Sequence, residues 1–273
     1  MWQPVFVTTD ERDAELGRIR LVDVRRPAAA AVQLADSEDP LVLIGHASTA
    51  SRLTVLATYV AANQPGRLVA HGVTHHAPLA AAAALDQAAS LARDAGHAVS
   101  AWRDVLEHTW SAAVLSSVTR LSRPNPTMSQ HLRSWWPSSR FVVRQGDDPR
   151  SVPAARVDEL IADLPRRGLE AFVTAGSDDE VVRHVVSAVA PTGLRTVEGL
   201  AGWPGVYGLS EQLQLALLPA DVALHVRAPA APCDTCGLHA ADPVCPFCRT
   251  RTRPSGTGPT SPTSPPQPVG DPS

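Results

Sequence analysis

The chain of 273 residues contains no lysine, and all 24 of its basic side chains are arginine. Arginine replaces lysine as a charge, but not as an amine that loses its proton and attacks a substrate. The sequence therefore excludes three kinds of site: a P-loop lysine on nucleotide phosphates, the strand lysine of protein kinases and a Schiff-base lysine.

The sequence also lacks a targeting segment and a long apolar run. Its first residues, MWQPVFVTTDERD, do not show the basic stretch followed by an apolar stretch of a secretory signal. The alanine-rich run at 79–92 is interrupted by Asp86 and Gln87, which makes it a poor membrane span. A net charge of −3 gives no reason to expect a strongly charged partner for the whole molecule. We therefore predict a cytoplasmic protein without a membrane partner.

Apolar segments of strand length alternate with segments of helical periodicity along most of the chain. We expect strands at 3–9, 41–45, 67–72, 140–144, 169–174 and 194–199, with one or two more within 19–35. We expect helices from Ser48 or Thr49 to about 62, from Pro78 to about Gly96, and at 101–122, 154–164 and 178–190. Ser177 and Glu180 would form a capping box for the last of these helices. This alternation predicts an α/β fold with a largely parallel sheet and flanking helices.

The composition changes near the C-terminus and suggests a division of the chain. Residues 1–227 form the α/β domain, either as one body or as two lobes with a boundary near 146–153. The sequence APAAP at 228–232 is typical of a semi-rigid hinge, and a zinc-binding module follows at 233–250. Residues 251–273 are rich in proline, serine and threonine, so we expect a disordered tail.

All four cysteines lie in one short segment with the spacing C-x2-C-x8-C-x2-C: Cys233, Cys236, Cys245 and Cys248. Two pairs of thiolates at this spacing can converge on one metal ion, and four thiolates leave no open position for catalysis. The segment therefore predicts one structural zinc per chain, although the spacing also fits iron. With so few large apolar side chains of its own, the module would depend on the metal for its folding energy. His239, between the two pairs, is either an alternative ligand or a loop residue.

The two halves of this segment, CDTCG and CPFCR, resemble the zinc-ribbon family over residues 233–249. The resemblance implies a positive φ at Gly237, just after the first cysteine pair. It also implies one of three roles for the module, because zinc ribbons bind nucleic acid, bind protein or stiffen a chain terminus. We favour a protein partner.

The stretch LVLIGHASTAS resembles the strand and elbow of α/β-hydrolases, which present a serine in the motif G-x-S-x-G. The corresponding residues here are Gly45, His46, Ala47, Ser48 and Thr49. Alanine stands in the place of the nucleophile and the second glycine is missing. We therefore reject the hydrolase interpretation.

The same stretch supports a different candidate site, because ligands of open α/β sheets bind beyond the carboxyl ends of the strands. Ser48, Thr49 and Arg52 would bind an anion at this edge. His46, His71 and His75 are the candidates for acid–base chemistry or for binding a metal. The alternative is that these histidines are structural, since no carboxylate partner is evident by spacing.

A basic and aromatic stretch extends from His108 to Gly146 without a single acidic residue. Arginines interleaved with Trp110, Trp135 and Trp136 could grip phosphates and stack on bases, as in nucleic-acid binding. The alternative is core packing, with Trp110 on an apolar helix face and Trp135 and Trp136 covering the core.

These observations favour a non-catalytic binding or assembly component in which the zinc module serves for interactions. The alternative is an enzyme or a small-ligand-binding domain that uses the edge at 46–76. The third hypothesis is nucleic-acid binding through residues 108–146. No complete catalytic constellation is evident in the sequence, which argues against an enzyme.

Overall fold

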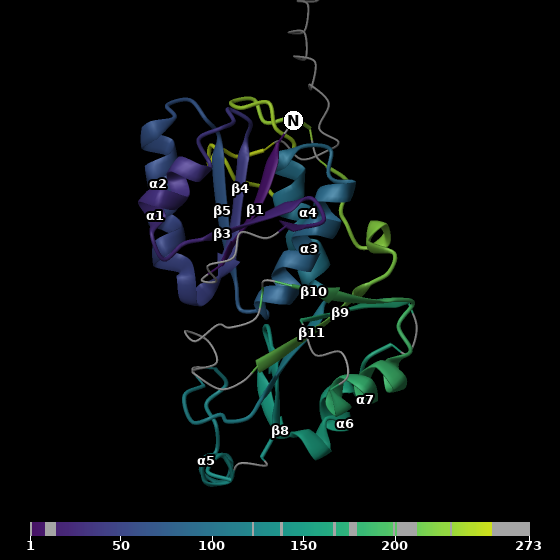
Figure 1. The fold of residues 1–273 in the computed structure, drawn as a ribbon. Helices are drawn as coiled ribbons and strands as arrows, with labels where there is room; N and C mark the ends of the chain where they lie inside the picture. The colour runs from purple at the N-terminus through teal and green to yellow at the C-terminus, as the bar shows by residue number, and fades with distance from the viewer. Residues whose placement is uncertain are drawn as a thin grey trace, which may run out of the picture.

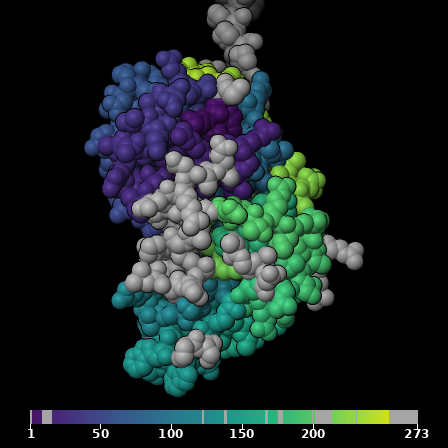
Figure 2. All heavy atoms as spheres, viewed as in Figure 1, coloured from purple at the N-terminus to yellow at the C-terminus, as the bar shows by residue number. Residues whose placement is uncertain are grey.

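Two β-sheets with a helix packed between them form the body of the molecule (Figure 1). The computed structural model describes residues 2–8, 15–121, 123–136, 139–165, 168–174, 179–198, 200, 212–229 and 231–252. Figure 2 shows the resulting two lobes, an upper one in purple and blue and a lower one in teal and green.

The first sheet has five strands in the order β2-β3-β1-β4-β5. Three of its pairings are parallel, namely β1 with β3, β1 with β4 and β4 with β5, and only the short β2 runs antiparallel. All six residues of β4, LVLIGH, are buried, as expected for a central strand covered on both faces. The strands are β1 (Gln3–Thr8), β2 (Glu15–Leu16), β3 (Ile19–Asp23), β4 (Leu41–His46) and β5 (Val69–Thr74).

Helices cover both faces of this sheet. The helices α1 (Pro27–Gln33) and α2 (Ala50–Asn63) pack on one face over Val5, Val7 and Leu43. On the opposite face, α3 (Pro78–Leu91) and α4 (Ala95–Glu107) pack over Phe6 and Ile44, because alternate residues of a strand point to opposite faces. A single turn, η1 (Ala47–Thr49), connects β4 to α2.

The second sheet has six strands in the order β10-β9-β11-β6-β7-β8 and is mostly antiparallel. Only β10 and β9 pair in parallel. Its strands are β6 (Trp110–Leu115), β7 (Phe141–Gln145), β8 (Arg150–Pro153), β9 (Leu169–Thr174), β10 (Leu194–Val197) and β11 (Gln212–Pro219). The short helices around it are α5 (Met128–Arg133), η2 (Ala154–Arg156), α6 (Asp158–Ile161), α7 (Glu180–Val189) and η3 (Val222–Leu224). An apolar cluster between α6, α7 and this sheet forms its own core.

The helix α3 contacts both sheets at once, touching β1 and β4 of the first sheet and β9 and β11 of the second. Residues 79–85, LAAAAAL, are all completely buried, so no side of this part of the helix faces solvent. Alanine suits the position because it favours the helix and because its small side chain lets two sheets approach from opposite sides. The helix therefore holds the two lobes together.

The predicted α/β fold, with a parallel sheet and flanking helices, is confirmed for the first sheet. The prediction of one helix at 101–122 was wrong, because α4 ends at Glu107 and β6 begins at Trp110. All six residues of β6 are buried on a sheet covered on both faces, and such a continuous apolar run also fits helical periodicity. Residues 27–33, within the stretch expected to hold strands, form α1, which Pro27 opens.

Two further expectations have mixed outcomes. Ser177 of the expected capping box lies outside the described residues, and the cap of α7 is Asp179, whose carboxylate accepts a hydrogen bond from the Val181 N–H at 2.8 Å.

Trp110 is buried, but Trp135 and Trp136 are 76% and 65% exposed, so the expectation that they cover the core was wrong. Within the described residues, no helix is long and apolar enough to span a bilayer.

The packing of α3 leads to a prediction about stability. Ala82→Leu places a larger side chain where both sheets already fill the space, so we expect a loss of about 1–3 kcal/mol or more in the free energy of unfolding. Ala62→Leu on the exposed face of α2 is the matched control and should change stability by less than about 0.5 kcal/mol. Urea unfolding of both variants measures the difference, and equal stabilities would contradict the tight packing described for α3.

Candidate functional site

The carboxyl ends of the first sheet's parallel strands face the second sheet, and four polar residues gather there. His46 is the last residue of β4 and pairs in register with Thr74, the last residue of β5. His75 and His76 follow Thr74 directly, and the chain then enters α3. This edge is where open α/β sheets place their ligands.

His46 is held in one tautomer by the turn that follows it. Its Nδ1 accepts hydrogen bonds from the Ser48 N–H at 3.1 Å and from the Ser48 hydroxyl at 2.9 Å, so the proton lies on Nε2. The Thr49 hydroxyl donates to the His46 carbonyl at 2.7 Å. Burial, together with the charge of His75, lowers the pKa of His46 to about 4. The imidazole is therefore neutral at pH 7, with its proton on Nε2.

His75 and His76 connect this edge to the second sheet. The ring of His75 lies edge-on to that of His46, with 6.3 Å between the ring centroids. The His75 carbonyl accepts a hydrogen bond from the Gly146 N–H at 3.2 Å, and a Cβ on Gly146 would lie 2.9 Å from the His76 ring. Burial lowers the pKa of His76, whose Nδ1 lies 3.4 Å from the Ser111 hydroxyl of β6. The edge is thus built from both sheets.

The first-turn amides of α3 are engaged by side chains of the second sheet. The Ala77 N–H donates to the Ser111 hydroxyl at 3.2 Å, and the Leu79 N–H donates to the Gln214 side-chain oxygen at 2.9 Å. Gln214 is completely buried and also donates through its amide to the Leu200 carbonyl at 2.7 Å. Because these two amides already donate to side chains, they are not available to bind an anion.

The other predicted site residues lie in different surroundings. Ser48 and Arg52 are exposed, whereas Thr49 is buried beside Gly45. His71 lies three register positions before the end of β5, on the order of 10 Å from the edge at strand spacing. Burial lowers the pKa of His71, with a smaller contribution from the charge of Arg249 in the cysteine module. The structure therefore brings His46 and His75 together and leaves His71 further back along β5; whether any of them binds a ligand stays a prediction.

The four cysteines form a compact cluster in which the ligand atoms all lie within 4.8 Å of one another. The Sγ atoms of Cys233 and Cys248 are 3.3 Å apart, and those of Cys236 and Cys245 are 3.5 Å apart. The Thr250 hydroxyl lies close to Cys233 and Cys248 and lowers the pKa of both thiols, which favours their thiolates, whereas burial raises the pKa of Cys236 and Cys245. This donor set fits a metal ion held by four thiolates.

The cluster is made of two equivalent hairpins that repeat the same backbone hydrogen bonds. In the first, Cys233 pairs with Leu238 and Gly237 donates to the Cys233 carbonyl; in the second, Cys245 pairs with Thr250 and Arg249 donates to the Cys245 carbonyl. The residue after each cysteine pair has a positive φ, 73° at Gly237 and 62° at Arg249. The expectation for Gly237 is confirmed, and Arg249 adopts at the equivalent position a conformation that glycine prefers.

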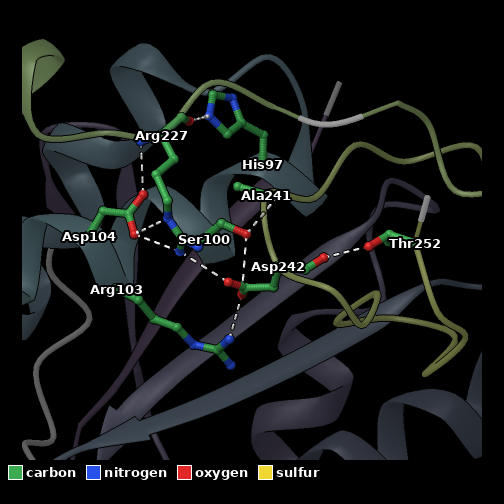
Figure 3. A network of polar contacts seen from close by, with 8 residues as sticks. All are labelled: His97, Ser100, Arg103, Asp104, Arg227, Ala241, Asp242 and Thr252. Carbon is green, nitrogen blue, oxygen red and sulfur yellow. Dashed lines mark hydrogen bonds and ion pairs between the residues drawn. The ribbon is translucent and has the colours of Figure 1, made fainter. Parts of the chain in front are cut away.

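The module rests on the outer face of α4, where a network of charged and polar groups joins the two (Figure 3). Asp242 of the module accepts hydrogen bonds from Arg103 at 2.7 Å and from Arg227 at 3.0 Å. Arg227 also binds the buried Asp104 carboxylate at 2.7 Å, and the Ala241 N–H donates to the Ser100 hydroxyl at 3.1 Å. Most of these contacts join chain segments more than a hundred residues apart.

The N-terminal end of α4 also contacts the cysteine module, through Asp94 and Gly96. One oxygen of Asp94 caps the helix through the His97 N–H at 3.0 Å, and the other accepts the backbone and ring N–H groups of His239 at 2.9 and 2.7 Å. A Cβ on Gly96 would lie 2.1 Å from the His239 carbonyl oxygen, so only glycine permits this approach. His239 therefore contacts Asp94 and is not part of the cysteine cluster. Sequence reasoning missed these residues because no local pattern pairs Asp94 or Gly96 with a module so distant in the chain.

Comparisons with known proteins give a fold but no close relative. No family model and no curated protein matches the chain. Solved structures of similar fold include a DegV family protein from Eubacterium eligens loaded with heptadecanoic acid, with a TM-score of 0.61 and 10% identity over 80% of this chain and 100% of that chain. The Fatty Acid Kinase (Fak) B3 protein of Streptococcus pneumoniae loaded with linoleic acid has a TM-score of 0.57, with 10% identity over 81% and 100%. A stearic acid-binding protein from Eubacterium ventriosum has a TM-score of 0.53, with 9% identity over 81% and 99%.

The low pKa of His46 predicts a dependence of stability on pH. Between pH 6.5 and about 4, the unfolded chain binds a proton at this imidazole and the folded chain does not, so stability falls as the pH falls through this window. We expect His46 to contribute on the order of 3 kcal/mol to that loss. His46→Gln should therefore lose less stability than the wild type between pH 7.5 and 4, as measured by urea unfolding. His131→Gln on α5 serves as control, and identical pH profiles for His46→Gln and wild type would refute the neutral buried state.

Proposed function

We propose that the chain binds a long-chain fatty acid and catalyses no reaction on it. The observation that carries the proposal is the fold shared along about four fifths of the chain with proteins whose structures hold heptadecanoic, linoleic and stearic acids. This likeness favours the small-ligand alternative over an assembly role. The proposal contains no chemical step, in keeping with the missing nucleophile at Ala47.

The edge at His46 and His75 is the place where we expect the carboxylate. A neutral imidazole with its proton on Nε2 donates a hydrogen bond to an anion, and the Ser48 hydroxyl, which donates to Nδ1, holds the ring in this tautomer. Arg52, about one turn into α2, adds a positive charge near the same edge. Hydrogen bonds to a charged acceptor stabilise a complex by about 1.5–3 kcal/mol each.

Titration of the delipidated protein with heptadecanoic, palmitic and lauric acids tests this proposal. We expect saturable binding of at least one of these acids, with an affinity about tenfold or more lower in His46→Gln because one charge-assisted hydrogen bond is lost. His131→Gln should bind like the wild type. Failure of all three acids to bind the folded wild type would overturn the proposal, whereas binding unaffected by His46→Gln would move the carboxylate to another place.

We infer that the cysteine cluster binds one zinc ion in a structural role. The four thiolates lie close enough together to bind one zinc ion, and they would complete its tetrahedral coordination shell. This shell leaves no position for a substrate or water. The equivalent hairpins and the Thr250 hydroxyl resemble the support that structural zinc sites receive from neighbouring groups. The contacts with α4 favour a module that stiffens the body of the protein at this helix.

Metal analysis of the purified protein should find one zinc per chain, and Cys236→Ser should abolish its binding. Because Asp242 and His239 join the module to α4, we expect metal loss to lower the melting temperature of the whole chain as well. Gly96→Ala is the complementary variant: it should keep the zinc and still lower the melting temperature by disturbing the contact with α4. An iron-type absorption spectrum, or an unchanged melting temperature after chelation, would contradict this assignment.

A further inference from the structure

In the short helix α5 and the turn after it, large apolar side chains face solvent and a polar side chain is buried, which is the opposite of the usual arrangement in a surface helix. The large apolar side chains are exposed: Met128 is 76% exposed, Leu132 49%, Trp135 76% and Trp136 65%. Met128, Leu132 and Trp135 follow one another at helical spacing, so they share one face. The buried side chain of α5 is the polar Gln130. Soluble proteins seldom expose adjacent tryptophans unless that surface binds something.

The polar side of this segment is fixed to the body of the lower lobe. The Gln130 amide donates to the Ser151 carbonyl at 2.7 Å, and its oxygen accepts from the Ser151 hydroxyl at 3.1 Å. The Ser134 hydroxyl accepts from the Val118 N–H at 3.1 Å. A capping box of Thr127 and Gln130 starts the helix. The apolar side chains are therefore presented on a backbone that is already ordered, which lowers the entropic cost of binding a partner.

The surroundings of this apolar surface are positively charged. No acidic residue occurs from 108 to 146, and Arg133 lies between the exposed apolar positions. A groove of about 600 Å³ runs beside α5 and is lined by Thr127, Gln130, Arg133, Arg150, Ser151 and Arg156. Two of these arginines have carboxylate partners: Arg156 is paired at 2.8 Å with Glu159, which also lines the groove, and Arg150 is paired at 2.8 Å with Asp148. The positive charge offered to an occupant therefore comes mainly from Arg133. An occupant of this region should combine apolar side chains with negative charge.

We propose that Met128, Leu132, Trp135 and Trp136, together with the adjacent arginine-lined groove, form a docking surface for a partner protein. The partner presents an extended or helical segment whose apolar side chains are flanked by aspartate or glutamate. Tryptophan, methionine and arginine are the residue types enriched at the centres of protein interfaces, and lysine and acidic residues are depleted there. In Figures 1 and 2, α5 lies at the lower tip of the molecule, on the lobe opposite the cysteine module.

The shape and chemistry of the groove favour a polypeptide over a bilayer or a nucleic acid. The groove has hydrogen-bond donors and acceptors on its lining, among them Thr127, Gln130 and Ser151, and a peptide backbone can satisfy both kinds. A bilayer surface does not enter such a groove, and the phosphodiester backbone of a nucleic acid, which has acceptors but no donors, would leave the acceptors of this lining unmatched. The apolar surface and the groove together therefore suit a partner chain.

A random peptide library displayed on phage, selected against the full-length protein and counter-selected with Trp135→Ser, tests the proposal. We expect the enriched peptides to combine aromatic or aliphatic residues with aspartate or glutamate. Synthetic peptides of the consensus should bind about tenfold or more weakly to Trp135→Ser and to Met128→Ser, as loss of an interface anchor predicts. Their affinity should also fall when salt is raised from about 50 mM to about 500 mM, and Arg133→Gln should reduce that dependence.

Leu224→Ser is the matched control, since Leu224 is 79% exposed and lies on η3. This variant should bind the peptides like the wild type, and all three serine variants should melt at the wild-type temperature because each replaced side chain is exposed. Peptides without acidic residues, or binding unaffected by Trp135→Ser, would overturn the proposal. Binding of phosphatidylglycerol vesicles or of a single-stranded DNA oligonucleotide that depends on Trp135, without peptide binding, would overturn it in favour of that surface.

Discussion

The packing of α3 between the two sheets is the constraint on which the rest of the structure depends. A helix with one sheet beside it buries a single stripe, whereas α3 buries its alanines on every side because a sheet lies on each of two opposite faces. Side chains larger than alanine would force the sheets apart, and polar ones would be buried without partners. The contact between the two lobes is therefore apolar and continuous with their cores, unlike the polar interface between two independent domains. They share one helix, which belongs to the core of both.

The same helix explains why the candidate ligand site includes residues of both sheets. It begins at Pro78, three residues after His75, and the amides at its start bind Ser111 and Gln214 of the second sheet. The loop before it therefore cannot move without disturbing these contacts, which fixes His76 against Ser111 and keeps His75 beside His46. The buried helix orders this edge when the chain folds, so a ligand that bound there would not have to order these groups itself.

The sequence predicted most of the first lobe because its strands and helices follow local rules. The expected end of the helix from Pro78 near Gly96 was wrong, because α3 ends at Leu91 and Gly96 lies in the first turn of α4. LVLIG is a fully buried strand, Pro78 opens a helix, and the four cysteines converge. The second lobe was predicted less well because β6 and β11 are buried on both faces, and a strand of that kind has no period-two pattern to separate it from a buried helix. The convergence of His46 with His75 followed from parallel pairing, but His71 lies too far back along β5 to join them. Contacts such as Asp94 with His239 depend on tertiary placement alone.

The contacts of the cysteine module connect it to the same central helix. The apolar side chains Leu238 and Phe247 pack against the core cluster that contains α3 and α4, and neither half of the module has a core of its own. The module covers α4 from Asp94 to Arg103, and a metal held by the four thiolates would order its two hairpins. Since α4 packs along α3, ordering of the module adds to the stability of the helix pair that joins the lobes. A metal bound by the four cysteines would therefore add rigidity to the edge at His46 and His75 as well, because the module packs on α4, α4 packs along α3, and α3 begins directly after that edge.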